Sequence, residues 1–384
     1  MSDILRQEIA ATASTIVVKV GTRVLTDARG RLDSARVAAL AEQINALMDV
    51  GRKVVLVSSG AVGAGMGRLK MDARPTDLAQ LQAVAAIGQS ALIEAYDRSF
   101  RVHGHHAAQV LLAADDMEHR TSYLNAKNTI RALLQLGAVP IINENDTVAV
   151  DELQTTFGDN DRLAAIVTNL IRAPLLVLLS DVEGLYDGDP TDPTSRVIDT
   201  VENLDRSVLD NVVRKARAAD AVALSKGGMG SKLEAARLAI ATGENVIIAG
   251  GREPRVLERI IAAETVGTLI LAKGQAVAAR KRWIGFSVQP RGRLLLDAGA
   301  AQAVEQQGGS LLAIGIAGVE GDFGKGDVVA LIDPQGKELG RGLTNYNSKN
   351  VSLIKGHRSD QIADLIGHCP YEEVVHRDNM AVTR

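Results

Sequence analysis

Hydrophobic positions between residues 15 and 251 form two kinds of pattern, short unbroken runs and longer stretches with helical spacing. The runs Thr15–Thr22 (T-I-V-V-K-V-G-T, which stops at Gly21) and Lys53–Ser59 (K-V-V-L-V-S-S) are typical of strands that are buried on both faces of a parallel sheet. Between these runs, the apolar residues share one face of a helix: Val37, Leu40, Ile44, Leu47 and Met48. This order of elements predicts a βαβ unit with parallel strands and a right-handed crossover.

The same alternation continues along the chain. Asp33 or Ser34 is expected to cap the first helix, and Gly51 is expected to end it. Further helices are predicted over Thr76–Phe100, Ser122–Leu136, Arg162–Arg172 and Lys232–Ala241. Each of them precedes an apolar strand, at residues 107–112, 139–143, 175–181 and 245–251. The pattern predicts a single α/β domain, a three-layer α/β/α sandwich around a mainly parallel sheet.

The pattern changes near Gln275. From there on, short apolar runs alternate with glycine turns and helical spacing fades, which predicts a small, mostly β barrel with little room for long helices. We therefore expect an α/β domain over residues 1–274, a basic linker over 275–282, and the barrel with a C-terminal tail over 283–384.

Composition narrows the class of protein. The 384 residues are 46% hydrophobic and 23% charged, which is ordinary for a globular protein. The net charge of −3 means that the chain has no overall excess of positive charge for binding nucleic acid. The single cysteine, Cys369, excludes an internal disulfide and a multi-cysteine metal site. The N-terminus does not read as a signal peptide, and no apolar run is long enough for a membrane span. We expect a cytoplasmic protein.

Lys19 is the unusual residue of the first strand. Desolvating an ammonium group costs several kcal/mol unless an anion or a carboxylate compensates. One interpretation is a phosphate-binding lysine at the carboxyl end of a central strand. The alternative is a strand-end lysine whose ammonium group reaches solvent.

A glycine-rich segment, S-S-G-A-V-G-A-G-M-G, follows the second strand. The dinucleotide-binding pattern G-x-G-x-x-G fails because residue 68 is Arg, and no phosphate-binding G-x-x-x-x-G-K-[ST] motif is present. We predict a glycine-lined nest of backbone N–H groups that holds an anion, with Ser59 donating a hydroxyl. The alternative is a flexible glycine turn.

Acidic residues gather after the strand at 139–143: Glu144, Asp146, Asp151, Glu152, Asp159 and Asp161. Beside an anion site, they are expected to bind a cation, namely a substrate ammonium, active-site lysines or a magnesium nucleotide. Asp159 has the alternative role of capping the helix that follows. No His/Cys cluster has zinc-ligand spacing.

The segment S-K-G-G-M-G-S-K-L-E brings another lysine to a predicted helix start. Ser231 with Glu234 predicts a capping box, which places Lys232 in the first turn of a helix that is preceded by three glycines. Backbone donors, the positive helix end and an ammonium group favour a phosphate site there. The alternative is a solvated lysine at an exposed helix start.

Together these segments resemble the amino acid kinase family over nearly the whole chain. The agreeing segments are V-V-K-V-G-T, V-S-S-G-A-V, I-I-N-E-N-D, F-G-D-N-D-R-L-A-A, S-D-V-E-G-L-Y-D-G-D-P, G-G-M-G-S-K and E-E-V-V-H-R-D-N-M. The region from about Trp283 is similar to a PUA domain, an RNA-binding module of RNA-modifying enzymes. The resemblance implies ATP-dependent phosphorylation of the glutamate γ-carboxylate, which starts proline synthesis.

The resemblance also implies roles for residues. Lys19 and Lys232 would contact the transferring phosphoryl group, with Asp161 orienting them. The glutamate-binding residues would be Ser59, Asp146 and Asn160. The ATP-binding residues would be Lys19, Ser180, Asp181, Lys226, Gly227, Gly228, Met229, Gly230, Ser231 and Lys232. Mg²⁺ would be bound mainly through the nucleotide, with no protein metal site.

The chain departs from the family pattern at two positions, since Lys226 and Ser231 stand where threonine is usual. We expect proline to act as an inhibitor and the chain to form a homo-oligomer, a dimer or a tetramer. One rival is a kinase for another acid or a small phosphate acceptor. Another is an RNA-binding factor that uses Arg280, Lys281, Arg282, Arg291 and Arg293, which the aromatic content of 3% does not favour.

Overall fold

The computed structural model describes residues 2–113, 117, 119–148, 159–202, 204, 228–272, 284–285 and 289–382. Contacts divide the chain into a first unit, residues 1–276, and a second unit, residues 277–384. Within the described ranges, no helix has the length and apolar character that a membrane span requires.

The first unit is built on an eight-stranded sheet with the strand order β3-β4-β2-β1-β5-β7-β8-β6. Its pairings are parallel except for the antiparallel pair of β7 and β8, so the predicted mainly parallel sheet is confirmed. The strands are β1 (Thr15–Val20), β2 (Lys53–Ser58), β3 (His106–Leu112), β4 (Ala138–Glu144), β5 (Leu175–Ser180), β6 (Thr200–Val201), β7 (Asn245–Gly250) and β8 (Thr268–Ile270).

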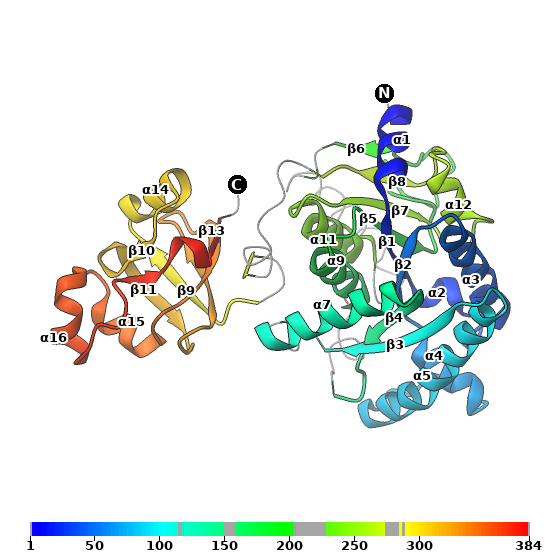
Figure 1. The fold of residues 1–384 in the computed structure, drawn as a ribbon, viewed down its shortest axis with the longest axis horizontal. Coiled ribbons are helices and arrows are strands. Elements are labelled where there is room, and N and C mark those ends of the chain that lie inside the picture. Colours follow the sequence, from blue (N-terminus) through cyan, green and yellow to red (C-terminus); the bar gives the residue numbers. More distant parts are fainter. Residues whose placement is uncertain are drawn as a thin grey trace. The chain divides into compact units, whose positions relative to one another are not determined.

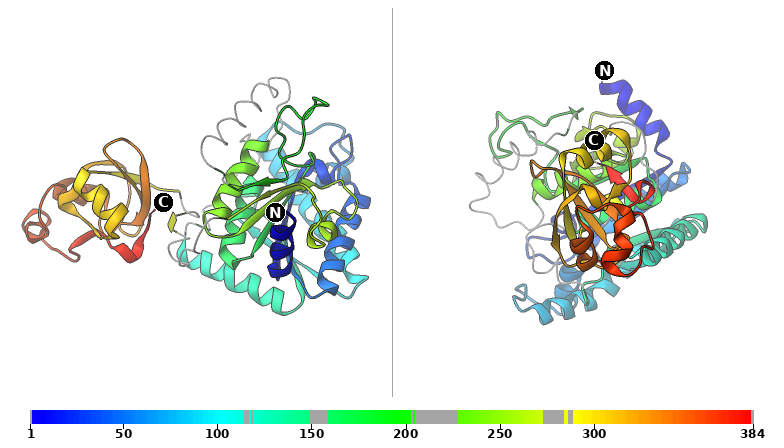
Figure 2. Two further views of the ribbon diagram at one scale, coloured as in Figure 1. Left: turned by 90° about the horizontal axis from the view of Figure 1, so that it is seen from above. Right: turned by 90° about the vertical axis from the view of Figure 1, so that its left-hand side faces the viewer.

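Helices cover both faces of this sheet, which gives the three layers predicted (Figure 1). Figures 1 and 2 show α7, α9 and α11 on one face and α3, α4, α5 and α12 on the other. Their bounds are α3 (Ser34–Asp49), α4 (Ala61–Arg68), α5 (Leu78–Arg101), α7 (Arg120–Gln135), α9 (Asp159–Ile171), α11 (Met229–Ile240) and α12 (Val256–Ile261). Two helices that the sequence did not predict are α1 (Ser2–Thr12) and the short α2 (Thr22–Leu25).

Alternation along β1 decides which way Lys19 points. Ile16, Val18 and Val20 are buried in the core that β1 shares with α3, where Val37 and Leu40 pack. Because successive strand residues point to opposite faces, Lys19 faces the other layer, which contains α9. The strand therefore supplies one ammonium group near its carboxyl end, between the apolar residues Val18 and Val20.

Helix ends agree with the prediction at α3 and differ at α11. The Asp33 carboxylate accepts hydrogen bonds from the backbone N–H groups of Ala35 and Arg36, which confirms it as the cap. The expected capping box of Ser231 with Glu234 is wrong, because α11 begins at Met229 with Gly228 as its N-cap. Gly228 has no side chain that could cap the helix, and the Ser231 hydroxyl donates a hydrogen bond to Asp161 instead.

Most of the glycine-rich segment after β2 is a helix and not the predicted nest, while anion binding beside Ser59 stays a prediction. Residues 61–68 form α4, and Gly60, with a φ of +114°, is the glycine that takes a left-handed turn there. Within the helix, a Cβ at Gly65 would lie 1.9 Å from the Val84 carbonyl oxygen. Glycine at this position therefore serves close packing of α4 against α5 rather than anion binding by a loop.

The second unit has its own core and is mostly β, as predicted. Its described strands form a five-stranded sheet with the order β11-β9-β12-β13-β15 and a separate β10–β14 pair. The strands are β9 (Gly292–Leu296), β10 (Leu311–Leu312), β11 (Ile316–Gly321), β12 (Val328–Ile332), β13 (Glu338–Leu343), β14 (Glu373–Val375) and β15 (Met380–Val382). The helices are short: α14 (Ala298–Gln307), α15 (Ser348–Ile354) and α16 (Ile362–Ile366).

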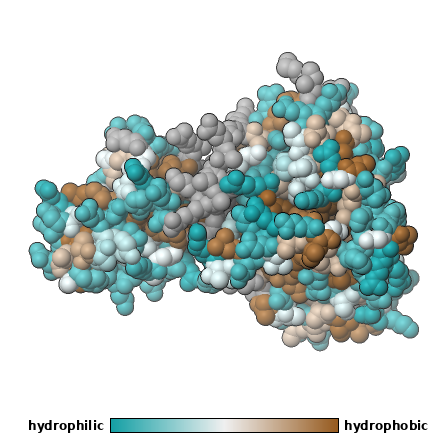
Figure 3. All heavy atoms as spheres, in the orientation of Figure 1, coloured by the Kyte–Doolittle hydropathy of each residue, from teal (hydrophilic) through white to brown (hydrophobic). Residues whose placement is uncertain are grey.

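Exposed apolar side chains on the first unit are dispersed rather than gathered. Val50, Val102 and Leu136, which are 68%, 79% and 81% exposed, each follow the last residue of a helix. Figure 3 shows apolar groups interspersed with hydrophilic ones over the visible face. Scattered apolar residues of this kind are normal on a protein surface and do not indicate a binding face.

Candidate active site

The candidate site lies along the edge of the sheet where four neighbouring parallel strands end. In the order β4-β2-β1-β5, these ends carry Asn143, Ser59, Lys19 and Ser180. In open α/β sheets, ligands bind beyond the carboxyl ends of the strands. The strand order therefore arranges the predicted site residues in one row, although they are distant in sequence.

One buried carboxylate holds two ammonium groups at the middle of this row. Lys19 Nζ lies 2.6 Å from Asp161 Oδ1, and Lys232 Nζ lies 3.6 Å from Asp161 Oδ2. The Ser231 hydroxyl donates to the same Oδ2 over 2.8 Å. The lysine side chains are 6% exposed and Asp161 is fully buried, so neither lysine reaches into solvent as the alternative interpretations supposed.

This ion triad, Lys19, Asp161 and Lys232, carries a net positive charge. Burial alone raises the pKa of the Asp161 carboxyl, but the two ammonium charges and the hydrogen bonds from Lys19 and Ser231 outweigh it, so that pKa is lowered. Burial lowers the pKa of Lys232, Asp161 opposes this, and Lys19 adds to it. One carboxylate balances only one of the two positive charges, so the triad is suited to bind an anionic group such as a phosphoryl group.

On the side of the triad toward β4, neutral polar side chains are joined by hydrogen bonds. Asn160 Nδ2 donates to Ser59 Oγ and to Asn143 Oδ1, each over 3.0 Å. Asn143 Nδ2 in turn donates to Gln89 Oε1 over 2.9 Å. The sequence predicted Ser59 and Asn160 as site residues but missed Asn143 and Gln89. One signal for Gln89 was present, since it follows the apolar spacing of the α5 core face together with Ala85, Leu92, Tyr96 and Phe100.

Asp146, two residues after β4, is a buried carboxylate. It is 8% exposed, and within the described ranges its Oδ1 has no hydrogen-bond partner. Burial raises its pKa to about 6, with the charge of Arg74 opposing. A buried carboxylate oxygen in this state is suited to accept a hydrogen bond from a cationic ligand.

Toward β5, the residues suit a polyanion. Ser180 Oγ donates to Asp181 Oδ1 over 3.1 Å, and Arg23 Nη1 donates to Asp181 Oδ2 over 3.0 Å. Burial raises the pKa of Asp181, but the hydrogen bond from Arg23 and the smaller contributions outweigh it and lower that pKa. Nearby, α11 has Gly228 as its N-cap, with no side-chain cap and no acidic residue in its first turn. The N–H groups at the start of a helix, here Gly228, Met229 and Gly230, have no hydrogen-bond partner within the helix and are suited to bind an anion.

Some predicted residues lie outside the described part of the chain: Lys226, Gly227, Asp151 and Glu152. The same holds for the side chain of Asp159, where α9 begins. Among the described residues, no group of three or more His, Cys, Asp or Glu side chains is arranged to hold a metal ion.

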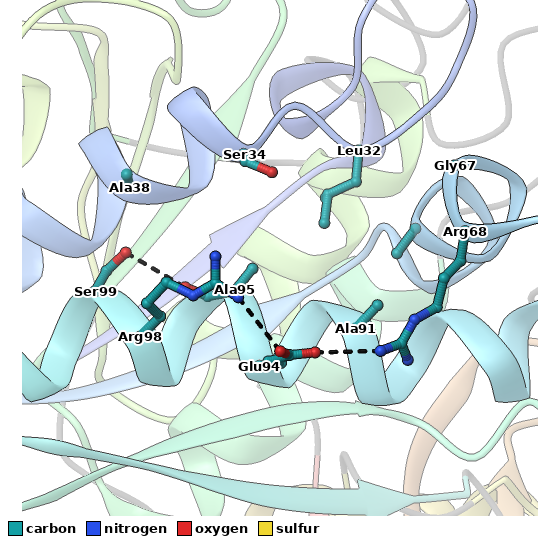
Figure 4. A pocket seen from close by; sticks show the side chains of 11 residues that line it. Leu32, Ser34, Ala38, Gly67, Arg68, Ala91, Glu94, Ala95, Arg98 and Ser99 are labelled. Carbon is teal, nitrogen blue, oxygen red and sulfur yellow. Dashed lines mark hydrogen bonds and ion pairs between the residues drawn. The ribbon is translucent and has the colours of Figure 1, made fainter. Parts of the chain in front are cut away.

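A separate hollow of about 450 Å³ lies between α3, α4 and α5 (Figure 4). Figure 4 shows Arg68 and Arg98 reaching toward Glu94 beside alanines that include Ala91 and Ala95. The hollow contains none of the predicted site residues.

One basic residue of the RNA-binding alternative forms an ion pair, and the alternative itself stays a prediction. Arg293 Nη1 lies 3.1 Å from Glu320 Oε2, so a carboxylate already balances its charge. Arg280, Lys281 and Arg282 lie outside the described residues.

Comparison with known proteins identifies the family to which the chain belongs. The amino acid kinase family matches residues 14–250, and the PUA domain matches residues 292–366. The chain is 49% identical over 378 residues to a protein from Rhodopirellula baltica named glutamate 5-kinase, covering 98% of this chain and 96% of that protein. Proteins of the same name from Nitrosococcus oceani and Pseudomonas putida are 46% and 47% identical, covering 98% and 95% of this chain and 99% and 97% of their own lengths.

A solved structure of UMP kinase from Bacillus anthracis superposes with a TM-score of 0.46 at 17% identity, covering 68% of this chain and 97% of that chain. The family matches and the relatives together assign the chain. The chain belongs to the amino acid kinase family, among relatives named glutamate 5-kinase, and it carries a PUA domain in its second unit.

Proposed function

We propose that this protein transfers the γ-phosphoryl group of ATP to the γ-carboxylate of L-glutamate, giving L-glutamyl 5-phosphate for proline biosynthesis. The observation that carries the proposal is the ion triad, in which Lys19 and Lys232 share Asp161 at the centre of the row of strand ends. The relatives named glutamate 5-kinase support the choice of acceptor.

The order of the row fits a transfer between two ligands. ATP would bind on the side of β5 and α11, through Ser180, Asp181 and the start of α11. Glutamate would bind on the side of β2 and β4, with Ser59 and Asn160 as hydrogen-bonding residues and Asp146 as the partner of the substrate ammonium. The phosphoryl group would then pass from ATP to glutamate beside the ammonium groups of Lys19 and Lys232.

The chemistry requires no general base. A γ-carboxylate is already ionised at neutral pH, so one of its oxygens forms the new bond to the γ-phosphorus while the bond from that phosphorus to the bridging β-oxygen breaks and ADP leaves. Catalysis is then positioning together with stabilisation of the charge on the phosphoryl oxygens. By analogy with a single preorganised donor, each lysine would lower the barrier by about 3 kcal/mol.

Asp161 would act on this charge through the lysines. Its carboxylate fixes the position of both ammonium groups and does not itself need to touch the phosphoryl group. Mg²⁺, held mainly by the nucleotide, would supply further neutralisation of phosphate charge.

The proposal is tested by measuring ADP release with four acceptors: glutamate, N-acetylglutamate, aspartate and UMP. We expect glutamate to give the highest kcat/KM. Preferential turnover of UMP or N-acetylglutamate would overturn the choice of acceptor while leaving the kinase assignment in place.

Proline is proposed as an inhibitor and the chain as a homo-oligomer, a dimer or a tetramer. The same ADP-release assay with added proline should show a lower rate at subsaturating glutamate, and an unchanged rate would reject the inhibition.

Light scattering of the full chain tests the oligomer. A dimer or a tetramer has two or four times the chain mass of 40.6 kDa, and a measured mass equal to that of one chain would reject the oligomer.

A further inference from the structure

Four buried polar side chains form one continuous hydrogen-bonded path, which we call the amide path: Gln89, Asn143, Asn160 and Ser59. They come from α5, β4, α9 and the residue after β2. Their exposed fractions are 8%, 1%, 1% and 5%. Ser59 and Asn160 already have proposed roles in the site, whereas Gln89 and Asn143 have none.

The direction of the hydrogen bonds along this path is fixed by one backbone group. The Glu144 N–H, which can only donate, points to Asn143 Oδ1 over 3.0 Å. The amide oxygen of Asn143 must therefore face Glu144 and Asn160, and its Nδ2 must face Gln89. It follows that Asn160 presents its Nδ2 to both Asn143 and Ser59 and that Gln89 presents its oxygen to Asn143.

This direction leaves donors at both ends of the path. Ser59 Oγ accepts from Asn160, so its own hydrogen is available to a ligand. Gln89 Nε2 is buried and has no hydrogen-bond partner among the described residues. A ligand group that meets such donors must be an acceptor, and a carboxylate, with several lone pairs and a negative charge, is the strongest one.

Close helix packing fixes where Gln89 lies. A Cβ at Gly88 would stand 1.8 Å from the Ala61 carbonyl oxygen and 2.3 Å from the Gly65 nitrogen. The backbone of α5 next to Gln89 therefore lies directly against the first turn of α4, which begins two residues after Ser59. Because this contact is between backbones, it holds the two ends of the path at a set separation.

We propose that Gln89 recognises the α-carboxylate of the acceptor through Nε2 while its Oε1 holds the amide path that positions Asn160 and Ser59. This inference rests on the proposed function. The ammonium and the carboxylate of an amino acid are on one carbon, and Asp146 and Asn143 both lie at the end of β4. The strands β4 and β1 are two positions apart in the sheet, about 10 Å, which an extended five-carbon diacid with a hydrogen bond at each end spans.

The test compares glutamate with isoglutamine, the α-amide that keeps the γ-carboxylate. For the full-length protein, kcat/KM should favour glutamate, and in Gln89→Met this preference should fall by about tenfold or more, the range of a hydrogen bond to a charged group. Equal loss of kcat/KM for both acceptors would overturn the contact, because a residue with only a structural role does not distinguish them.

A second variant separates contact from folding. Gln89→Glu keeps the acceptor for Asn143 but replaces the donor with a negative charge, so it should melt at nearly the same temperature and raise the KM for glutamate by about tenfold or more. An unchanged KM would contradict the proposal.

A matched control is Gln43→Met. Gln43 is also buried at 9%, but its amide is satisfied by Leu257 and Ala39, away from the site. It should leave the preference for glutamate over isoglutamine unchanged. Activity of the unaltered protein on glutamate checks the proposed function separately, since that activity is required whatever Gln89 does.

Discussion

One carboxylate stands between two basic side chains at two places in the first unit. On the surface, Glu94 lies 3.3 Å from both Arg68 and Arg98 and is 57% exposed. In the site, Asp161 holds Lys19 and Lys232 and is fully buried. The composition of the two clusters is the same, two cations and one anion, but their solvent environments are opposite.

The difference lies in what happens when the anion is removed. Around Glu94, water solvates the arginines in either case, so an exposed pair contributes about 0–1 kcal/mol. Around Asp161, water is excluded, and removing the carboxylate leaves two uncompensated buried charges. A cluster that is costly in this way and lies at the sheet edge is better explained by function than by stability.

The largest expected effect is that of Asp161→Asn. Loss of one member of a buried ion cluster should lower the free energy of unfolding by about 3–5 kcal/mol, and kcat should fall by roughly 10²-fold or more because the lysines lose their orientation. Urea unfolding and ADP release measure the two effects.

Glu94→Gln is the matched control. It also removes one carboxylate from between two cations, and it should change the free energy of unfolding by about 1 kcal/mol or less with kcat unchanged. Equal losses of stability in the two variants would show that burial does not distinguish the clusters.

Asp146 extends the comparison, since it is buried like Asp161 but forms no ion pair with the residues that the structure describes. With a pKa of about 6, it is ionised and able to bind an ammonium group above pH 6, and it is protonated below. We therefore expect kcat/KM for glutamate to fall as pH decreases through about 6, because this ratio reports groups of the free enzyme.

Asp146→Ala should chiefly raise the KM for glutamate, by about 10²-fold. An effect on the KM for ATP alone would contradict its assignment to the acceptor.

The smallest expected effect concerns Glu244, a third buried carboxylate, which is 5% exposed and accepts a hydrogen bond from Thr242. Burial raises its pKa from 4.5 to about 7, although hydrogen bonds and Arg172 oppose this. Between these values, the folded state binds a proton that the unfolded state lacks, so stability should decrease as pH rises, by at most about 3 kcal/mol.

Glu244→Gln should remove this pH dependence, as measured by thermal unfolding at pH 5 and pH 8. Glu234→Gln, at an exposed carboxylate paired with Arg237, is the control and should leave it unchanged. A pH dependence that persists in Glu244→Gln would show that another group is responsible.

The sequence predicted what periodicity and turn residues encode. The parallel sheet, the layers, the cap at Asp33 and the ammonium group on β1 all follow from local patterns. It failed where a tertiary contact decides between two local structures. Glycines at 63, 65 and 67 suggested a loop, but they belong to the helix α4, in which Gly65 packs closely against α5.

Long-range partners were the other limit. Arg6 in the unpredicted α1 donates hydrogen bonds to the carbonyl oxygens of Asp199 and Val266, which no local pattern indicates. Likewise, the sequence showed Lys19 and Lys232 as two unusual lysines, but their sharing of one carboxylate depends on three elements meeting. The sequence named several residues that the structure brings together in the candidate site, but not Asn143, Gln89 or the contacts among these residues.

The most direct test of the account is the turnover of Lys232→Ala at saturating ATP and glutamate. If the triad stabilises the transferring phosphoryl group, kcat falls by roughly 10²-fold or more in a variant that still unfolds cooperatively, because Lys19 and Asp161 remain paired. A folded variant with near-normal kcat would contradict the central claim.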